Sequence, residues 1–394
     1  MSTQSLLTPS LVTKDTLEML ENNLVFASRV NRQYEGQFAK IGSTITVRKP
    51  NRYRIRSGPG ISIQNITEPS TSITISNQKG VDFQFSSQDL TLTIEEFSDR
   101  YLKTAAAEVA NVIDVDLAAN FNQIFNEVGT PGTVPNNYSF LAAVGQRMDE
   151  GAVPQDGRTL VLNPAAHWAL ASALSVLFVR SVAEPALKGY LAAIANFEIF
   201  LDQNILVQTV GAYGGTAVVN GANQTGGSLV TNGWSASVNG LLNVGDVFTI
   251  DGVNAINPKS RNTTGALQNF VVTTTVNSDS GGNATIQMNP SITTSGAYQT
   301  VSGSPANLSR VRPIGTASTT YAQNLGFVRD CFGLVVVPIE VPMGVDFGAR
   351  ETYKNISIRI VRAFDINNDV TPCRLDVLYG TSTFYAELGC RLTN

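Results

Sequence analysis

The chain has 394 residues and a mass of 42.1 kDa, which is enough for several domains. Its 27 Lys and Arg residues nearly balance 31 Asp and Glu residues, and this excludes a nucleic-acid binder that works through positive charge over its whole surface. His167 is the only histidine, so a zinc site built from several histidines is excluded. The three cysteines have no C-x-x-C spacing, which favours an intracellular, reduced setting. Without a signal-peptide pattern or a long apolar window, we expect a soluble cytosolic protein without a membrane span.

The first 41 residues are predicted to be an N-terminal arm that ends in a helix. A polar stretch that can cap a helix comes first, at Thr13–Thr16. Apolar residues then recur at three- and four-residue intervals between Leu17 and Val30, which is the pattern of one helical face.

From residue 42 to about residue 92 the apolar pattern changes to a period of two, which predicts an extended β loop. Ile45 and Val47 alternate with polar residues, and the same alternation continues over 52–56, 61–63, 73–75 and 81–85. Large apolar residues are sparse, so this loop cannot bury a core of its own. We expect it to lie on another part of the chain or on a neighbouring subunit.

Residues 93–137 are predicted to hold a long spine helix. Thr93 and Glu96 have the spacing of a capping box, in which each side chain satisfies a free N–H at the helix start. Ala105, Val109 and Phe121 follow at helical spacing, and Gly129 stops the pattern, so we expect the helix to end near Val128.

Residues 138–207 are predicted to be a mixed α+β region. A short buried strand at 158–162 is followed by Asn163 and Pro164, which start a helix. We expect a second helix over Pro185–Ala195 and a second strand over Phe197–Phe200.

Residues 208–318 are predicted to form an inserted all-β barrel. Only five charged residues lie between Gly211 and Leu308, where Thr, Ser, Asn and Gly dominate. Strand patterns separated by turn residues occur at 215–219, 247–250, 270–276 and 284–288. Insertion into another domain is tolerated where the two insertion points lie close together on the surface. We expect residues 211–308, expressed alone, to fold as a β domain.

Residues 319–394 are predicted to be rich in strands that close the fold. Strand patterns occur at 333–338, 356–363, 374–378 and 384–391.

No catalytic, metal or cofactor site is predicted. His167 begins an apolar helix beside Trp168, where a structural role is expected. Asp246, Asp251 and Asp279 match no EF-hand spacing and are typical of turns between strands. Cys331 and Cys390 lie in apolar runs, where a buried thiol is inert.

One charged cluster stands out on the extended β loop, where side chains two residues apart on a strand share a face. It consists of Arg48, Lys49, Arg52, Arg54 and Arg56. Three interpretations are open: a solvated strand face, a nucleic-acid groove, or a subunit contact. Only Tyr53 offers the aromatic stacking that a single-strand groove uses. We favour a subunit contact, because the planar fork of arginine pairs well with carboxylates. Candidate acidic partners at the start of the spine helix of an adjacent molecule are Glu95, Glu96 and Asp99.

Four stretches and their order along the chain resemble the major capsid proteins of tailed double-stranded DNA bacteriophages. The chain is most similar to the coat proteins of short-tailed phages that carry an inserted β-barrel domain. Leu242–Val253 resembles a hairpin of that barrel, and Asn277–Ile286 resembles a later turn and strand. Asn324–Leu334 resembles the segment where the chain re-enters the capsid core, and Leu160–Ala165 the strand-to-helix step of the axial domain.

The resemblance implies an α+β tailed-phage capsid fold and a structural protein, not an enzyme. In that fold, residues 93–137 would form the spine helix and peripheral domain, residues 138–207 the first part of the axial domain, and residues 319–394 the closing strands of both domains. It implies a coat subunit that assembles into hexamers and pentamers of an icosahedral head, in the cytoplasm of the host bacterium. Implied partners are other copies, a scaffolding protein, a portal protein and, weakly, the packaged double-stranded DNA. The extended loop would lie over a neighbouring subunit. The alternative is a secreted β-rich adhesin or carbohydrate-binding protein, suggested by the middle of the chain.

Overall fold

The computed structural model describes residues 25–35, 44–61, 63–64, 66, 68–86, 103–174, 190–345, 347–353, 356–368 and 370–394. These residues are assigned to two units. One contains residues 1–47, 71–117 and 332–384, and the other contains residues 48–70, 118–331 and 385–394. Both combine helices with β-sheets, so the predicted α+β class is confirmed.

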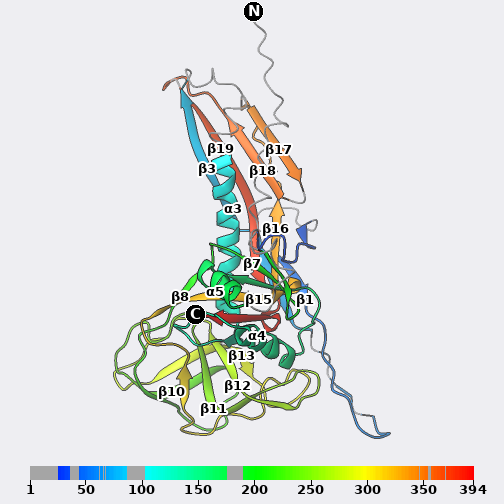
Figure 1. Ribbon diagram of the computed structural model, residues 1–394, viewed down its shortest axis with the longest axis vertical. Helices are drawn as coiled ribbons and strands as arrows, with labels where there is room; N and C mark the ends of the chain where they lie inside the picture. The colour runs from blue at the N-terminus through cyan, green and yellow to red at the C-terminus, as the bar shows by residue number, and fades with distance from the viewer. Residues whose placement is uncertain are drawn as a thin grey trace, which may run out of the picture. The chain divides into compact units, whose positions relative to one another are not determined.

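The first unit is built on a five-stranded antiparallel sheet (Figure 1). Its longest strand pairs with strands on both sides, and ten residues of it are in register with β3. Leu375, Val377 and Tyr379 alternate along it and are buried, as expected for one face of a strand packed on a core. The strands are β3 (Asn77–Ser86), β16 (Phe332–Val337), β17 (Phe347–Tyr353), β18 (Ile356–Arg362) and β19 (Val370–Thr383).

Helix α3 (Lys103–Ala118) belongs to the same unit and lies along β3 and β19 in Figure 1. Its buried face consists of residues four apart, one helical turn each: Ala105, Val109, Ile113 and Leu117. The predicted spine helix is therefore confirmed for these residues, but its predicted end near Val128 is wrong. The α-helix ends at Ala118, a 3-10 turn covers Ala119–Gln123, and β4 (Glu127–Val128) pairs with a strand instead.

Part of the predicted extended loop forms strands and part does not. Strand β1 (Thr44–Arg48) pairs with β2 (Ser70–Thr74), where Val47 and Ile73 are buried. Residues 49–57, 61 and 63 are in no strand, so the strands predicted over 52–56 and 61–63 are wrong. No sheet hydrogen bonds join these residues to another described strand, and alternation alone does not make a ladder. Residues 25–35 form turns, so the predicted arm helix does not extend into this described part.

The second unit contains a seven-stranded mixed sheet. Its central strand β15 pairs with β20 and β5, and also with β8. Every residue of β5 is buried, in agreement with the predicted strand. Helices α4 (Tyr138–Glu150) and α5 (Pro164–Leu174) bury Leu141, Val144 and Leu170 in one core with it. The remaining strands are β6 (Tyr190–Ile194), β7 (Phe197–Leu201), β8 (Val207–Thr209), β15 (Thr320–Val328) and β20 (Gly389–Thr393), with β5 at Arg158–Leu162.

Two expectations fail within this sheet. Residues 190–194, predicted as the end of a helix, form β6, and residues 185–189 lie outside the described part. The reason is a hairpin to β7, because Ala195 and Asn196 both have positive φ, as a type I′ turn requires. The strand predicted over 384–391 is a 3-10 turn at Ala386–Leu388 followed by β20.

The predicted β insertion forms a six-stranded antiparallel sheet with a single apolar core (Figure 1). Residues 308–310 are hydrogen-bonded to β9, and the next residues, β14, pair with β11. The two edges of the sheet are therefore joined through residues 308–313, as in a barrel. The strands are β9 (Gly215–Val219), β10 (Gly226–Trp234), β11 (Val247–Ile256), β12 (Thr263–Val272), β13 (Ala284–Ile292) and β14 (Val311–Pro313).

The sequence located β9 correctly, found only parts of β11 and β13, and missed β10 and β14. The strand predicted over 270–276 starts and ends too late, because β12 runs from Thr263 to Val272. The predicted boundaries of the inserted domain, at residues 208 and 318, stay predictions.

Candidate functional site

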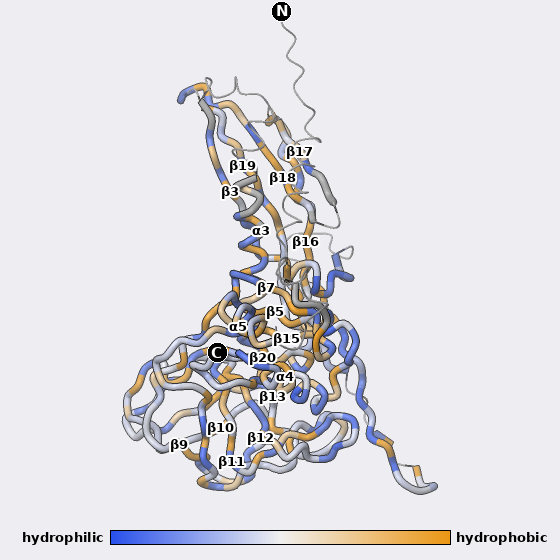
Figure 2. The backbone as a smooth tube through the Cα atoms, in the orientation of Figure 1, coloured by the Kyte–Doolittle hydropathy of each residue, from blue (hydrophilic) through white to orange (hydrophobic). Residues whose placement is uncertain are grey.

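The described residues of the segment 49–69 form a narrow excursion of the second unit (Figure 1). Its apolar side chains are exposed within the subunit: the exposed fractions of Ile55, Ile61 and Ile63 are 94%, 88% and 90%. Figure 2 shows hydrophilic and hydrophobic stretches in succession along it. A run of exposed isoleucines is typical of a surface that another protein covers.

The base of the excursion is held to its own unit by Lys49 and Arg52. The Lys49 backbone N–H donates to the Pro69 carbonyl oxygen at 2.8 Å, and its ammonium lies 5.2 Å from the centre of the Tyr385 ring. Burial lowers the pKa of Lys49 from its ordinary value. Arg52 pairs with the Glu387 carboxylate through its guanidinium.

The other three residues of the cluster, Arg48, Arg54 and Arg56, are exposed. Arg48 lies 3.6 Å from the Glu68 carboxylate, an exposed pair of the kind worth about 0–1 kcal/mol. The Arg54 backbone N–H donates to Gln64 Oε1 at 2.8 Å, and Gln64 Nε2 donates back to the Arg54 carbonyl oxygen, so the two arms of the excursion are fastened together.

The five predicted basic residues thus lie on one segment, but they do not share a strand face. Two of them, Lys49 and Arg52, have partners that sequence reasoning missed: Tyr385 and Glu387. Those partners are more than 300 positions away, and no local pattern links them. The predicted acidic partners Glu95, Glu96 and Asp99 lie outside the described residues.

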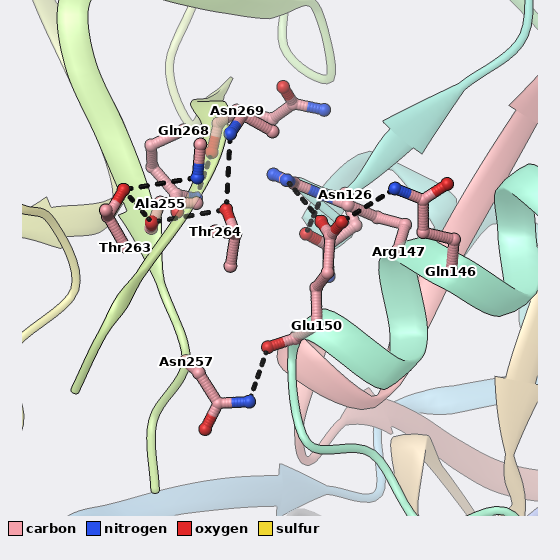
Figure 3. A network of polar contacts seen from close by, with 12 residues as sticks. Asn126, Gln146, Arg147, Glu150, Ala255, Asn257, Thr263, Thr264, Gln268 and Asn269 are labelled. Carbon is pink, nitrogen blue, oxygen red and sulfur yellow. Dashed lines mark hydrogen bonds and ion pairs between the residues drawn. The ribbon is translucent and has the colours of Figure 1, made fainter. Parts of the chain in front are cut away.

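Polar contacts fasten the inserted sheet to α4 and β4, and Figure 3 shows the one between Asn257 and Glu150. Asn257 Nδ2 donates to the carbonyl oxygen of Glu150, the last residue of α4, at 3.0 Å. Asn269 Nδ2 donates to the Glu127 carbonyl oxygen at 2.9 Å. Glu150 also accepts from Gln146 and lies 3.8 Å from Arg147. Asn257 thus holds the β11–β12 turn on the end of α4, and Asn269 holds β12 on β4.

The start of the insertion is fixed by the buried Asp246. Its carboxylate accepts hydrogen bonds from Gly211 N at 2.9 Å, Asn243 N at 2.8 Å and Gln208 Nε2 at 2.8 Å. Burial raises the pKa of Asp246, although these donors and the Arg391 charge oppose the rise. One side chain therefore joins the entry segment 208–211 to the turn before β11. Asp251 instead pairs with Arg312 at the surface, and Asp279 caps its own turn.

The other candidate chemical groups are built into cores. His167 is 1% exposed, and burial lowers its pKa. Cys331, Cys373 and Cys390 are buried and unpaired by disulfides, and burial raises the pKa of Cys373 to about 11 and of Cys390 to about 12. Within the described ranges, no group of three or more acidic, histidine or cysteine side chains could hold a metal ion. None of the helices described has the length and apolar character to cross a membrane.

Comparison with solved structures places the fold. The chain is similar to a structure from Mycobacterium phage Che8, with 12% identity, 94% of this chain and 90% of that chain covered, and a TM-score of 0.50. It is also similar to the capsid of Ralstonia phage GP4, with 8% identity, 94% and 90% coverage and a TM-score of 0.45. The TM-score of 0.50 shows that the chain shares its fold with the Che8 structure.

The family is defined more narrowly by the sequence. The model of the P22 coat protein, gene protein 5, matches residues 1–394, and the chain belongs to this family. None of the curated protein sequences compared with the chain matches it. The chain is therefore a head-forming major capsid protein of a bacteriophage, a structural protein of the virion that associates with copies of itself, and not an enzyme. The adhesin alternative has no support.

Proposed function

We propose that the excursion 49–69 is the segment through which one coat subunit lies on the next in hexamers and pentamers of the head. The observation that carries this proposal is the exposure of Ile55, Ile61 and Ile63 on a segment without sheet pairing among the described strands. Burial of each isoleucine against a neighbouring copy stabilises the contact, by about 1.5–3 kcal/mol if the side chain is fully buried. Arg48, Lys49, Arg52, Arg54 and Arg56 then contact the acidic residues of that copy, with Glu95, Glu96 and Asp99 as the candidates.

The test is the triple variant I55S/I61S/I63S. Because these side chains are exposed in the subunit, the variant should fold with an unchanged thermal midpoint. It should nevertheless fail to form shells, measured by sedimentation and electron microscopy of negatively stained samples. The matched control I55V/I61V/I63V keeps the apolar surface and should assemble. Normal shells from the serine variant would refute the role of the excursion.

We further propose that assembly takes place in the host cytoplasm with a scaffolding protein and a portal protein, and that packaged double-stranded DNA is contacted weakly. The family resemblance supports these partners, and the near-neutral charge of the chain agrees with a weak contact to DNA. Adding the scaffolding protein to purified subunits should increase the yield of closed shells of uniform size. An unchanged yield would refute its role.

A further inference from the structure

Three arginines from two distant segments gather at the base of the excursion. Arg52 and Arg54 come from the excursion itself, and Arg261 comes from the turn between β11 and β12 of the inserted sheet. The Arg52 backbone N–H donates to the Tyr298 hydroxyl at 3.3 Å, and its guanidinium carbon lies 5.9 Å from the centre of the Tyr298 ring. Arg261 donates to the carbonyl oxygen of the preceding residue, Ala297. Both arginines therefore bind the same short segment.

The cluster has more positive than negative charge. Burial and the charges of Arg52 and Arg54 all lower the pKa of Arg261, as expected when cations are held close together. Glu387 neutralises only Arg52. Among the residues that the structure describes, no carboxylate pairs with Arg54 or Arg261, and Nη1 of Arg261 is buried without a hydrogen-bond partner. The arrangement has surplus positive charge, and an anion bound at its surface would relieve it.

The position of Arg261 is fixed by its turn. Its backbone has a φ of +63°, a conformation that residues other than glycine rarely adopt. Its N–H donates to the Asn257 carbonyl oxygen at 2.9 Å, and Asn257 is in turn bonded to the end of α4 (Figure 3). A guanidinium held in this way loses little freedom when it binds a ligand.

The surroundings indicate which anion the cluster takes. A guanidinium fork binds carboxylates and phosphates equally well. However, the exposed Ile55 and Ile63 lie on the same excursion as Arg54, and exposed isoleucines suit a protein surface better than a nucleic-acid backbone. The protein that this chain associates with in a capsid is a second copy of itself.

We propose that Arg52, Arg54 and Arg261 form one composite site that binds an acidic side chain of a second copy, so that the inserted sheet takes part in the subunit contact. This inference rests on the proposed role of the excursion. It adds a residue from the inserted sheet that the sequence pattern did not indicate.

The first test is the assembly rate of R261G, followed by light scattering over a range of salt concentrations. Glycine fits the positive φ and removes the charge. Assembly should slow by about tenfold or more, as expected for the loss of a charge-assisted contact, and should become less sensitive to salt. The matched control K259Q removes a positive charge from the same turn and should assemble like the parent. If R261G has a lower thermal midpoint, R54Q replaces it, because the Arg54 side chain is exposed.

The second test identifies the partner. Shells are assembled from equal amounts of ¹⁴N- and ¹⁵N-labelled R261K subunits and treated with a carbodiimide, which joins an amine to a carboxylate in contact. Mixed ¹⁴N–¹⁵N peptide pairs that contain position 261 and an acidic peptide are expected. Cross-links confined to Glu387 of the same copy would overturn the proposal.

The outcomes separate this inference from the proposed function. If I55S/I61S/I63S blocks assembly while R261G and R54Q assemble at the parental rate, the excursion keeps its role and the composite site is refuted. If R261G assembles normally but binds a double-stranded DNA fragment more weakly in a mobility-shift assay, the anion is a phosphate and the proposal is likewise wrong.

Discussion

At the scale of single residues, His167 is a titratable group whose effect can be measured in isolation, because the chain has no other histidine. The imidazole is buried, its Nδ1 has no hydrogen-bond partner within the described part, and burial lowers its pKa. Below the ordinary value of 6.5 the unfolded chain therefore binds a proton that the folded chain does not. Stability from this group is complete above pH 6.5 and is lost as the pH falls below that value toward the lower folded pKa.

We therefore expect the urea midpoint of the parent to fall between pH 7.5 and pH 5, and the fall to be smaller in H167Q. The difference between the two slopes of urea midpoint against pH isolates the contribution of the histidine. Buried carboxylates such as Asp246 have raised pKa values and act in the opposite direction, but both proteins contain them. Equal slopes for the two proteins would contradict the buried neutral imidazole.

At the scale of the elements, one buried carboxylate joins three strands of the first unit. Asp376 on β19 accepts two bonds from Arg359 on β18, at 2.9 Å and 2.5 Å, and one from Gln78 on β3 at 2.9 Å. Arg374 lies 2.9 Å from the same carboxylate. Because Asp376 is buried, D376N leaves the largely buried Arg359 guanidinium without its counter-charge, and we expect a loss of about 3–5 kcal/mol in the free energy of unfolding.

D82N is the matched control, because Asp82 contacts the same Arg374 at 3.8 Å but is exposed. It should cost less than about 1 kcal/mol in denaturant unfolding. A similar loss in both variants would show that burial is not the reason for the effect.

Individual strands and helices show what sequence patterns can and cannot predict. Strands such as β5 and β9 were located correctly because their burial follows local alternation or a continuous apolar run. Residues 190–194 were predicted as the end of a helix, but pairing with β7 determines their structure. The basic residues of the excursion were found, whereas Tyr298, Arg261 and Glu387 were not. Their place beside Arg52 depends on pairings between strands far apart in sequence.

At the scale of the whole molecule, the closure of the inserted sheet revises the fragment that should fold alone. Residues 211–308 lack β14 and residues 309–310, which are hydrogen-bonded to β11 and β9. Without them both edges of the sheet expose unpaired backbone groups and the core opens. We expect residues 208–318 to give a dispersed ¹H–¹⁵N spectrum typical of a folded β domain, and residues 211–308 to give a collapsed or aggregated one. Well-dispersed spectra from both fragments would show that closure is not needed.

The position of β15 has a consequence for how the protein is made. Its neighbours in the sheet are β5, which precedes the insertion by some fifty residues, and β20, which is synthesised more than sixty residues later. The inserted sheet, in contrast, draws all its strands from residues 215–313. On the ribosome the insertion can therefore complete its hydrogen bonds while β5, which can already pair with β7, still lacks β15 on its other side. Each nascent chain therefore carries a folded insertion before its seven-stranded sheet is complete. That sheet gains β20 only at the end of synthesis.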